Sequence, residues 1–454
     1  MTNVNKLGTE DIRKLIFTLG WPAALNFVVA TAHNLADVIY VGNWLGPLQI
    51  AAVVVVGTIS FIFSAFGLGL GGAGGSIISR ALGSNDYEKA NKTFGNKILL
   101  VASIGLVIVA MGWIFETPIL KLFGARGDIF GYASAYYRIT LFSVPLLAFT
   151  MMSNNIIHTE GKARLAMWFN ITPTTLNIIL NPVFLLVFNM GIEGVAWATF
   201  ISITVGFVLP LIYFISGRSV VKLGRKYLKF QREILLEIGH IGGAILANVV
   251  AMNLFVIVLN QVLFKYYQES GVVIYGIISR LNMIFIIILA GVEGGIRPVI
   301  GFNYGSKQID RVRKAVELGL KYGGIICFGL MILVLFSGNY LVHLFTNDEQ
   351  IIVETSYAMR IVFALFPLNV LQIVNTAYFQ TIGKPNTALY LSLTKNVILT
   401  IPLLFILPLY LGYNGVLFTF PIVEVLITVP SIWVLHRELN YNLTRRLEVS
   451  ISKV

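Results

Sequence analysis

The chain has 454 residues, of which 57% are hydrophobic and only 12% are charged, and its mean hydropathy is +0.81. A soluble protein of this length could not cover so many apolar side chains with polar surface, so the composition excludes a cytosolic enzyme, a secreted disulfide scaffold and a disordered protein. The net charge of +12 could indicate nucleic-acid binding, but in a membrane protein the excess lysine and arginine belongs in cytoplasmic loops. We therefore expect a polytopic membrane protein whose partner is the lipid bilayer, with no nucleic acid.

Apolar runs long enough to span a bilayer follow one another along the chain. A helix needs about 20 mostly apolar residues to cross the hydrocarbon core. We expect twelve transmembrane helices, at residues 15–41, 48–79, 94–115, 136–157, 163–188, 194–215, 236–263, 272–301, 316–336, 358–381, 387–410 and 415–435. The runs lack the strict alternation of a membrane β-barrel, so the fold class should be an all-α membrane protein.

The basic residues orient this bundle. With both termini in the cytoplasm, 25 lysines and arginines fall in inward segments and 5 in outward loops. This bias predicts a multi-pass protein with cytoplasmic termini, and we expect it in the inner membrane of a bacterium. The N-terminal segment lacks a small-residue cleavage site, so we expect no cleaved signal peptide. We expect a monomer.

A weak internal repeat has an offset of 222 residues. Pro145 corresponds to Pro367, and the segment TEGK at 159–162 corresponds to TIGK at 381–384. The offset predicts two pseudo-symmetric lobes of six helices, at residues 1–217 and 236–454, joined by a basic cytoplasmic linker at 218–235. Parallel repeats with a central cleft are typical of transporters that work by alternating access.

Enzyme chemistry has little support in the sequence. The single cysteine, Cys327, excludes an intramolecular disulfide and a cysteine-based metal site. The five histidines are scattered, and we find no nucleotide-binding loop and no Ser/His/Asp spacing. We therefore expect no enzyme activity and no cofactor.

Polar side chains recur on one face of three of the predicted helices, which therefore should face each other or a wet cavity rather than lipid. Asp37 is the only acidic residue in the first six runs, and an ionisable residue inside a span is a functional candidate by default. The three stripes are Asn26, His33, Asn34 and Asp37 in the first run, Asn170, Thr174, Asn177 and Asn181 in the fifth, and Thr199 and Ser202 in the sixth.

The coupling chemistry follows from these residue types. A carboxylate shielded from water favours its neutral form and can carry a proton, whereas the same group among amide and hydroxyl oxygens can hold Na⁺. A single carboxylate favours H⁺, and a Na⁺ site would comprise Asp37, Asn177, Asn181 and Thr199. In the alternatives, Asp37 is a helix-end residue about 6 Å from the exit of its span, and the asparagines only bond helices together.

Charged residues also occur inside spans of the second half. Glu293 and Arg297 are four residues apart in the eighth run and can pair on one helix face. Lys395 and Glu424 lie at overlapping depths in the eleventh and twelfth runs, where they can pair or Glu424 can attract a cationic substrate. The candidate substrate-cavity or gating residues are His33, Asn34, Glu293, Arg297, Lys395 and Glu424.

Several motifs together resemble the multidrug and toxic compound extrusion (MATE) transporters over nearly the whole chain. They are residues 34–37 (NLAD) with Val41-Gly42, 80–86 (RALGSND), 177–182 (NIILNP), 194–199 (GVAWAT), 301–305 (GFNYG) and 383–385 (GKP). The resemblance implies export of organic cations or amphipathic compounds in exchange for H⁺ or Na⁺. It also implies a cation site at Asp37, Asn177, Asn181 and Thr199. One departure concerns position 181, which is often Asp in the branch with the best-described site and is Asn here.

Two rival functions remain open at this point. A flippase for lipid-linked saccharides of the wider superfamily would need a cationic cleft for phosphates, which Arg280, Arg297 and Lys395 could supply. A lipid-modifying membrane enzyme would change its substrate covalently rather than move it. The sequence leaves open which small molecule is exported.

Overall fold

The computed structural model of the chain describes residues 3–443, without the side chains of residues 3, 33–35, 269 and 442. Helices fill nearly all of that range, and it contains no strand. Eleven of its helices are long and apolar enough to cross a membrane, and a pair bent by 46°, Glu349–Val362 with Phe366–Thr381, makes a twelfth if it counts as one span. The bent pair covers the tenth predicted run, so the predicted all-α fold with twelve spans is confirmed.

The helices follow the predicted order. The first half of the chain forms α1 (Asn3–Thr9), α2 (Ile12–Trp44), α3 (Pro47–Ser64), α4 (Phe66–Gly83), α5 (Tyr87–Ile114), α6 (Glu116–Leu122), α7 (Asp128–Thr140), η1 (Leu141–Ser143), α8 (Val144–Thr159), α9 (Ala163–Pro182), η2 (Val183–Val187), α10 (Gly191–Ile215) and η3 (Arg225–Tyr227). The second half forms α11 (Arg232–Gly305), α12 (Ile309–His343), α13 (Glu349–Val362), η4 (Phe366–Leu368), α14 (Asn369–Thr381), α15 (Pro385–Leu393), η5 (Thr394–Leu399), α16 (Thr400–Leu411), α17 (Tyr413–Arg437) and η6 (Glu438–Asn442). The backbone of α11 leaves helical geometry at Tyr267 and Gln268, so this element contains two spans, Arg232–Gln268 and Ser270–Gly305.

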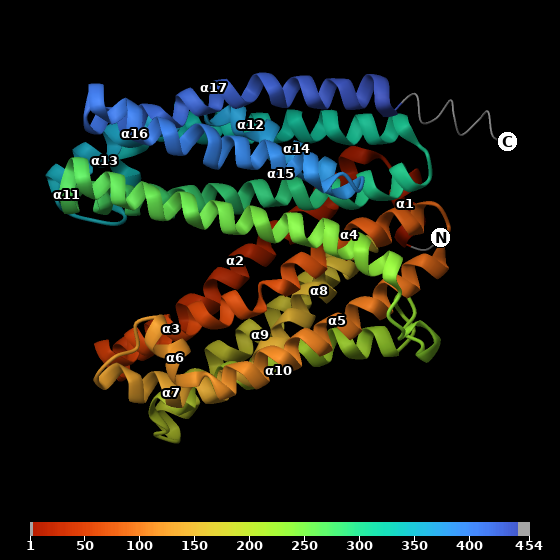
Figure 1. Cartoon of the computed structure of the whole chain (residues 1–454), viewed down its shortest axis with the longest axis horizontal. Coiled ribbons are helices and arrows are strands. Elements are labelled where there is room, and N and C mark those ends of the chain that lie inside the picture. Colours follow the sequence, from red (N-terminus) through yellow and green to blue (C-terminus); the bar gives the residue numbers. More distant parts are fainter. Residues whose placement is uncertain (1–2, 444–454) are drawn as a thin grey trace. The chain divides into compact units, whose positions relative to one another are not determined.

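The chain divides into two compact units, each of which packs its own long helices side by side (Figure 1). Within the described residues, the first unit contains Trp21–Leu246 and residues 3–6, and the second contains Leu7–Gly20 and residues 247–443. The division therefore falls inside α11 rather than in the predicted linker at 218–235. The start of α11 belongs to the first unit because Glu237 pairs with Arg80 of α4 at 3.0 Å and Gly242 lies against Gly69. The predicted lobes, 1–217 and 236–454, remain a prediction about the moving parts.

Small residues set the helix packing of the first unit. The glycine-rich helix α4 packs against α5 and α8 (Figure 1). A Cβ atom at Gly67 would lie 2.7 Å from the Cα atom of Ala148 in α8, so only glycine allows the two backbones to approach this closely. Helix α8 packs in turn against α9 and α10. The polar residues described next lie on α2, α7, α9 and α10.

Candidate cation-coupling site

The carboxylate of Asp37 lies buried in the first unit, where three other helices supply hydrogen-bond donors to it. The amide Nδ2 of Asn181 in α9 donates to Asp37 Oδ1 at 2.8 Å. On the other oxygen, Oδ2, the hydroxyl of Thr199 in α10 donates at 3.0 Å and that of Tyr136 in α7 at 3.3 Å. Asp37 is only 6% exposed, so these contacts replace water around the carboxylate.

A second layer of contacts fixes these donors. Asn177 lies one helical turn before Asn181 and is completely buried. Its Nδ2 donates to Thr199 Oγ1 at 3.4 Å, and its Oδ1 accepts from Asn181 Nδ2 at 3.3 Å. The structure thus brings together the four residues predicted for cation coupling: Asp37, Asn177, Asn181 and Thr199. That these four residues bind the coupling ion remains a prediction.

The predicted polar stripes face each other along much of the unit. At the other end of the first stripe, Asn170 Nδ2 donates to Asn26 Oδ1 at 3.1 Å. Asn154 of α8 extends this contact, since its Nδ2 donates to Asn170 Oδ1 at 2.7 Å. Between Asn26 and Asp37 the helix rises about 16 Å. Polar contacts between α2 and α9 therefore occur at both ends of this length.

The electrostatics of the site are unusual for a buried carboxylate. Among the described side chains, no lysine, arginine or histidine forms an ion pair with Asp37. All three donors are neutral, and Asn181 Oδ1 is buried without a hydrogen-bond partner. Taking an unpaired charge out of water is costly. Uptake of a cation by the site would therefore be stabilising.

Tyr136 was not among the residues predicted for the site. It is 4% exposed and contacts Asp37 and Thr199, with 3.4 Å between the hydroxyl oxygens of Tyr136 and Thr199. The chain has 19 tyrosines, and a tyrosine ring usually packs as an apolar group. Tyr136 also stands outside the three stripes, at the start of the fourth predicted run. No local pattern distinguished its hydroxyl from those of the other tyrosines.

The other candidate residues lie apart from this site or outside the described side chains. The side chains of His33 and Asn34 lie outside the described residues. In the second unit, Arg297 pairs with Glu293 and also donates to Gln380 Oε1 at 2.8 Å. Lys395 Nζ donates to Glu424 Oε1 at 2.6 Å. A role for these residues in a substrate cavity or in gating remains a prediction.

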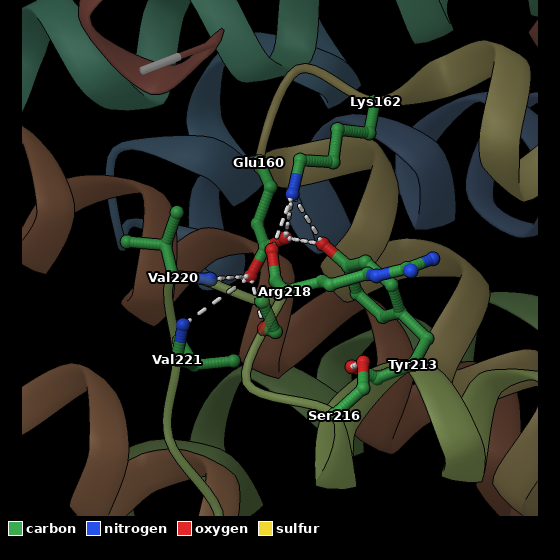
Figure 2. Close-up of polar contacts among 8 residues, drawn as sticks. Glu160, Lys162, Tyr213, Ser216, Arg218, Val220 and Val221 are labelled. Carbon is green, nitrogen blue, oxygen red and sulfur yellow. Dashed lines mark hydrogen bonds and ion pairs between the residues drawn. The ribbon is translucent and has the colours of Figure 1, made fainter.

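The first unit contains a second buried carboxylate, Glu160, whose contacts hold the chain together and leave no oxygen free. Glu160, fully buried at the end of α8, accepts from the backbone N–H of Val220 at 2.9 Å and from the hydroxyls of Tyr213 and Ser219 (Figure 2). Lys162 lies 3.7 Å from this carboxylate and donates to the carbonyl of Arg218 at 2.7 Å. The cluster ties the start of the basic linker to α8 and α10, and it satisfies both carboxylate oxygens.

The chain has clear relatives among known proteins. The sequence profile of the MatE family matches it twice, over residues 22–183 and 244–406, and the two matches begin at the 222-residue offset of the predicted repeat. The multidrug export protein MepA of Staphylococcus aureus strain MRSA252 is 25% identical over 445 residues, which cover 98% of this chain and 97% of MepA.

Solved structures show the same fold. A crystal structure of a MATE protein in the bent conformation superimposes with a TM-score of 0.92 at 25% identity, covering 98% of this chain and 99% of that one. A MOP superfamily transporter from Pyrococcus furiosus superimposes with a TM-score of 0.88 at 25% identity, covering 97% and 98%. The paired helical units and the double profile match agree, and this chain belongs to the MatE family of multidrug and toxic compound extrusion transporters, which are not enzymes.

Proposed function

We propose that the protein exports organic cations or related amphipathic compounds in exchange for protons, with Asp37 as the coupling group. The observation that carries the proposal is a buried carboxylate with three neutral donors and no counter-cation among the described side chains. A proton that enters from outside would neutralise Asp37 and favour one conformation of the transporter. Its release to the cytoplasm would favour the other, so that cycling moves substrate outward.

The donor set suits a proton carrier because it can serve both states of the carboxyl group. The ionised group accepts from the hydroxyls of Thr199 and Tyr136. When the group is protonated, either hydroxyl can rotate and accept from it, since a hydroxyl is both donor and acceptor. Asn181 donates to the other oxygen in both states. The Asp37 carboxyl group therefore keeps a hydrogen-bond partner on each oxygen in both states, while Asn181 Oδ1 has no partner in the structure.

Sodium coupling is the weaker proposal at this site. Na⁺ would need Asp37 together with oxygens of Asn177, Asn181 and Thr199, but the amide nitrogen of Asn181 points at the carboxylate. The single carboxylate thus supports H⁺ as the coupling ion.

The substrate class and location rest on the relatives. MepA carries the name multidrug export protein, and we propose a comparable range of small molecules for this chain. We propose that it is a monomer in the inner membrane of a bacterium. The distribution of its basic residues supports a cytoplasmic position for both termini. Of the three basic residues of the flippase alternative, Arg297 and Lys395 are each paired with a glutamate and so offer less charge to a phosphate, which leaves Arg280 as its main support.

Transport in proteoliposomes tests the proposal. A pH step is imposed without Na⁺, and uphill movement of tetraphenylphosphonium is recorded for the wild type and for Asp37→Asn. We expect uphill movement in the wild type and none in the variant. Equal uphill movement in both would remove Asp37 from the mechanism, and movement that requires a Na⁺ gradient would replace the proton by Na⁺.

A further inference from the structure

Three glutamates of the described chain are nine-tenths or more buried, and they differ in how completely they are paired. Glu160 has partners on both oxygens. Glu438, 3% exposed, accepts from Lys384 Nζ on both oxygens, at 2.6 and 2.5 Å. Glu424, 9% exposed, accepts from Lys395 Nζ on Oε1, while its buried Oε2 has no hydrogen-bond partner. Glu424 alone among the three therefore retains an unused carboxylate oxygen.

The depth of this pair matters. Glu424 stands in the middle of α17, about 16 Å along the helix from Tyr413 and about 20 Å from Arg437. Lys395 lies in η5, a short π-helical segment within its span. Such segments are rare and often occur at functional sites. In the first half, the π-helical segment η2 likewise follows directly after Asn181 and Pro182 of the Asp37 site.

A buried ion pair in the middle of a span is poor evidence of stabilisation, because desolvation of two charges offsets their attraction. Ionisable groups at this depth usually mark a path for ions or substrates. Lys395 uses one of its three N–H donors in its hydrogen bond to Glu424, and Glu424 uses one of its two oxygens. The arrangement suits an exchangeable pair better than a fixed clamp, of which Lys384 and Glu438 are the example in the same unit.

From this contrast we infer that Glu424 is a binding site for an organic cation, and that the ammonium group of Lys395 occupies it until the cation displaces it. The inference rests on the proposed export function and names a substrate contact for it in the second unit. Weakly hydrated cations with spread charge are the favoured ligands, because they lose less hydration than a compact ammonium when they enter an apolar interior.

Binding of tetraphenylphosphonium to the purified full-length protein tests this inference, with tetraphenylborate as an anion of matching size. The variants are Glu424→Gln, Lys395→Met and the double variant, and the control is Lys384→Met with Glu438→Gln, a buried pair of the same residue types. We expect Lys395→Met to bind the cation about tenfold more tightly. A site that is free of its competitor in only about a tenth of the molecules has its apparent affinity lowered about tenfold, and removing the competitor restores it.

We expect the affinity for the cation to fall at least tenfold in Glu424→Gln and in the double variant, and to stay unchanged in the control pair. The affinity for the anion should not rise in Lys395→Met. A purely structural pair predicts the opposite sign, since both single variants would then weaken binding and the neutral double variant would restore it. Should Lys395→Met not fold, Glu424→Gln decides, because wild-type affinity in that variant overturns the inference.

A transport measurement distinguishes failure of this inference from failure of the proposed export function. If the wild type exports tetraphenylphosphonium uphill and Lys395→Met binds it no more tightly, the inference is wrong and the export function stands. If the wild type neither binds nor moves the cation, both fail. Uphill export that depends on Asp37, together with tighter binding in Lys395→Met, supports both.

Discussion

A second carboxylate beside Asp37 should change the coupling ion of the site from H⁺ to Na⁺. In Asn181→Asp, the new side chain would place an oxygen where the amide nitrogen now lies, 2.8 Å from Asp37 Oδ1. Two unit charges at this separation repel by about 6 kcal/mol at an effective dielectric constant of about 20. The two carboxylates therefore cannot both be ionised near neutral pH, and they should share a proton or hold a cation.

Transport by this variant should become dependent on Na⁺. Without Na⁺ the shared proton is held too tightly, so we expect proton-driven uptake of tetraphenylphosphonium in proteoliposomes to fall about tenfold or more, which corresponds to at least 1.4 kcal/mol. Addition of Na⁺ should restore transport by neutralising the carboxylate pair, whereas the wild type should not respond to Na⁺.

An exchange variant provides the control. Asp37→Asn combined with Asn181→Asp retains one carboxylate and one amide at the same contact, so it should transport without Na⁺. Wild-type behaviour of Asn181→Asp with and without Na⁺, in protein that melts at the wild-type temperature, would refute the placement of Asn181 against the coupling carboxylate.

Three further predictions concern the donors, the linker and the helix packing. Thr199→Val removes a 3.0 Å bond to a carboxylate, a loss of about 1.5–3 kcal/mol, so proton-driven transport should fall tenfold or more, and Tyr136→Phe, at 3.3 Å, should cost less. Equal transport rates in Thr199→Val, Tyr136→Phe and the wild type would contradict this ranking of the two donors. Glu160→Ala removes the acceptor of the linker N–H groups, and we expect about 3–5 kcal/mol less stability, a lower melting temperature and faster tryptic cleavage in the linker, with Glu160→Gln intermediate. Unchanged cleavage would show that Glu160 does not hold the linker. Gly67→Ala should destabilise by about 1–3 kcal/mol through overpacking because its Cβ meets Ala148, whereas Gly57→Ala, with nothing within 4 Å, should be neutral or stabilising; equal melting temperatures would contradict this.

The spans could be predicted from sequence because a bilayer demands long apolar helices. The bent tenth span was predicted only as one run, since its break at residues 363–365 lies inside the apolar stretch 361–368 (IVFALFPL). The set around Asp37 could be predicted in part, because stripes of amides and one carboxylate must turn away from lipid. Tyr136 could not, since its position depends on how α7 packs.

One helix crossing shows why the internal repeat is weak in sequence. Lys97 of α5 lies over Gly74 of α4, where a Cβ would be 1.9 Å from its Nζ. At the equivalent positions, 222 residues later, the large residue is Ile296 and the small one is Gly319, with a Cβ distance of 3.1 Å to Cγ2. Large and small partners have exchanged places while the close approach is retained, so packing is conserved between halves where residue identity is not.

The measurement that tests the central claim most directly is the number of protons released when tetraphenylphosphonium binds to the purified protein in weakly buffered solution with a pH indicator. If substrate and proton exclude each other through Asp37, the wild type should release close to one proton per cation bound, and Asp37→Asn, which still binds the cation, should release none. Equal proton release from both proteins would contradict the assignment of Asp37 as the coupling group.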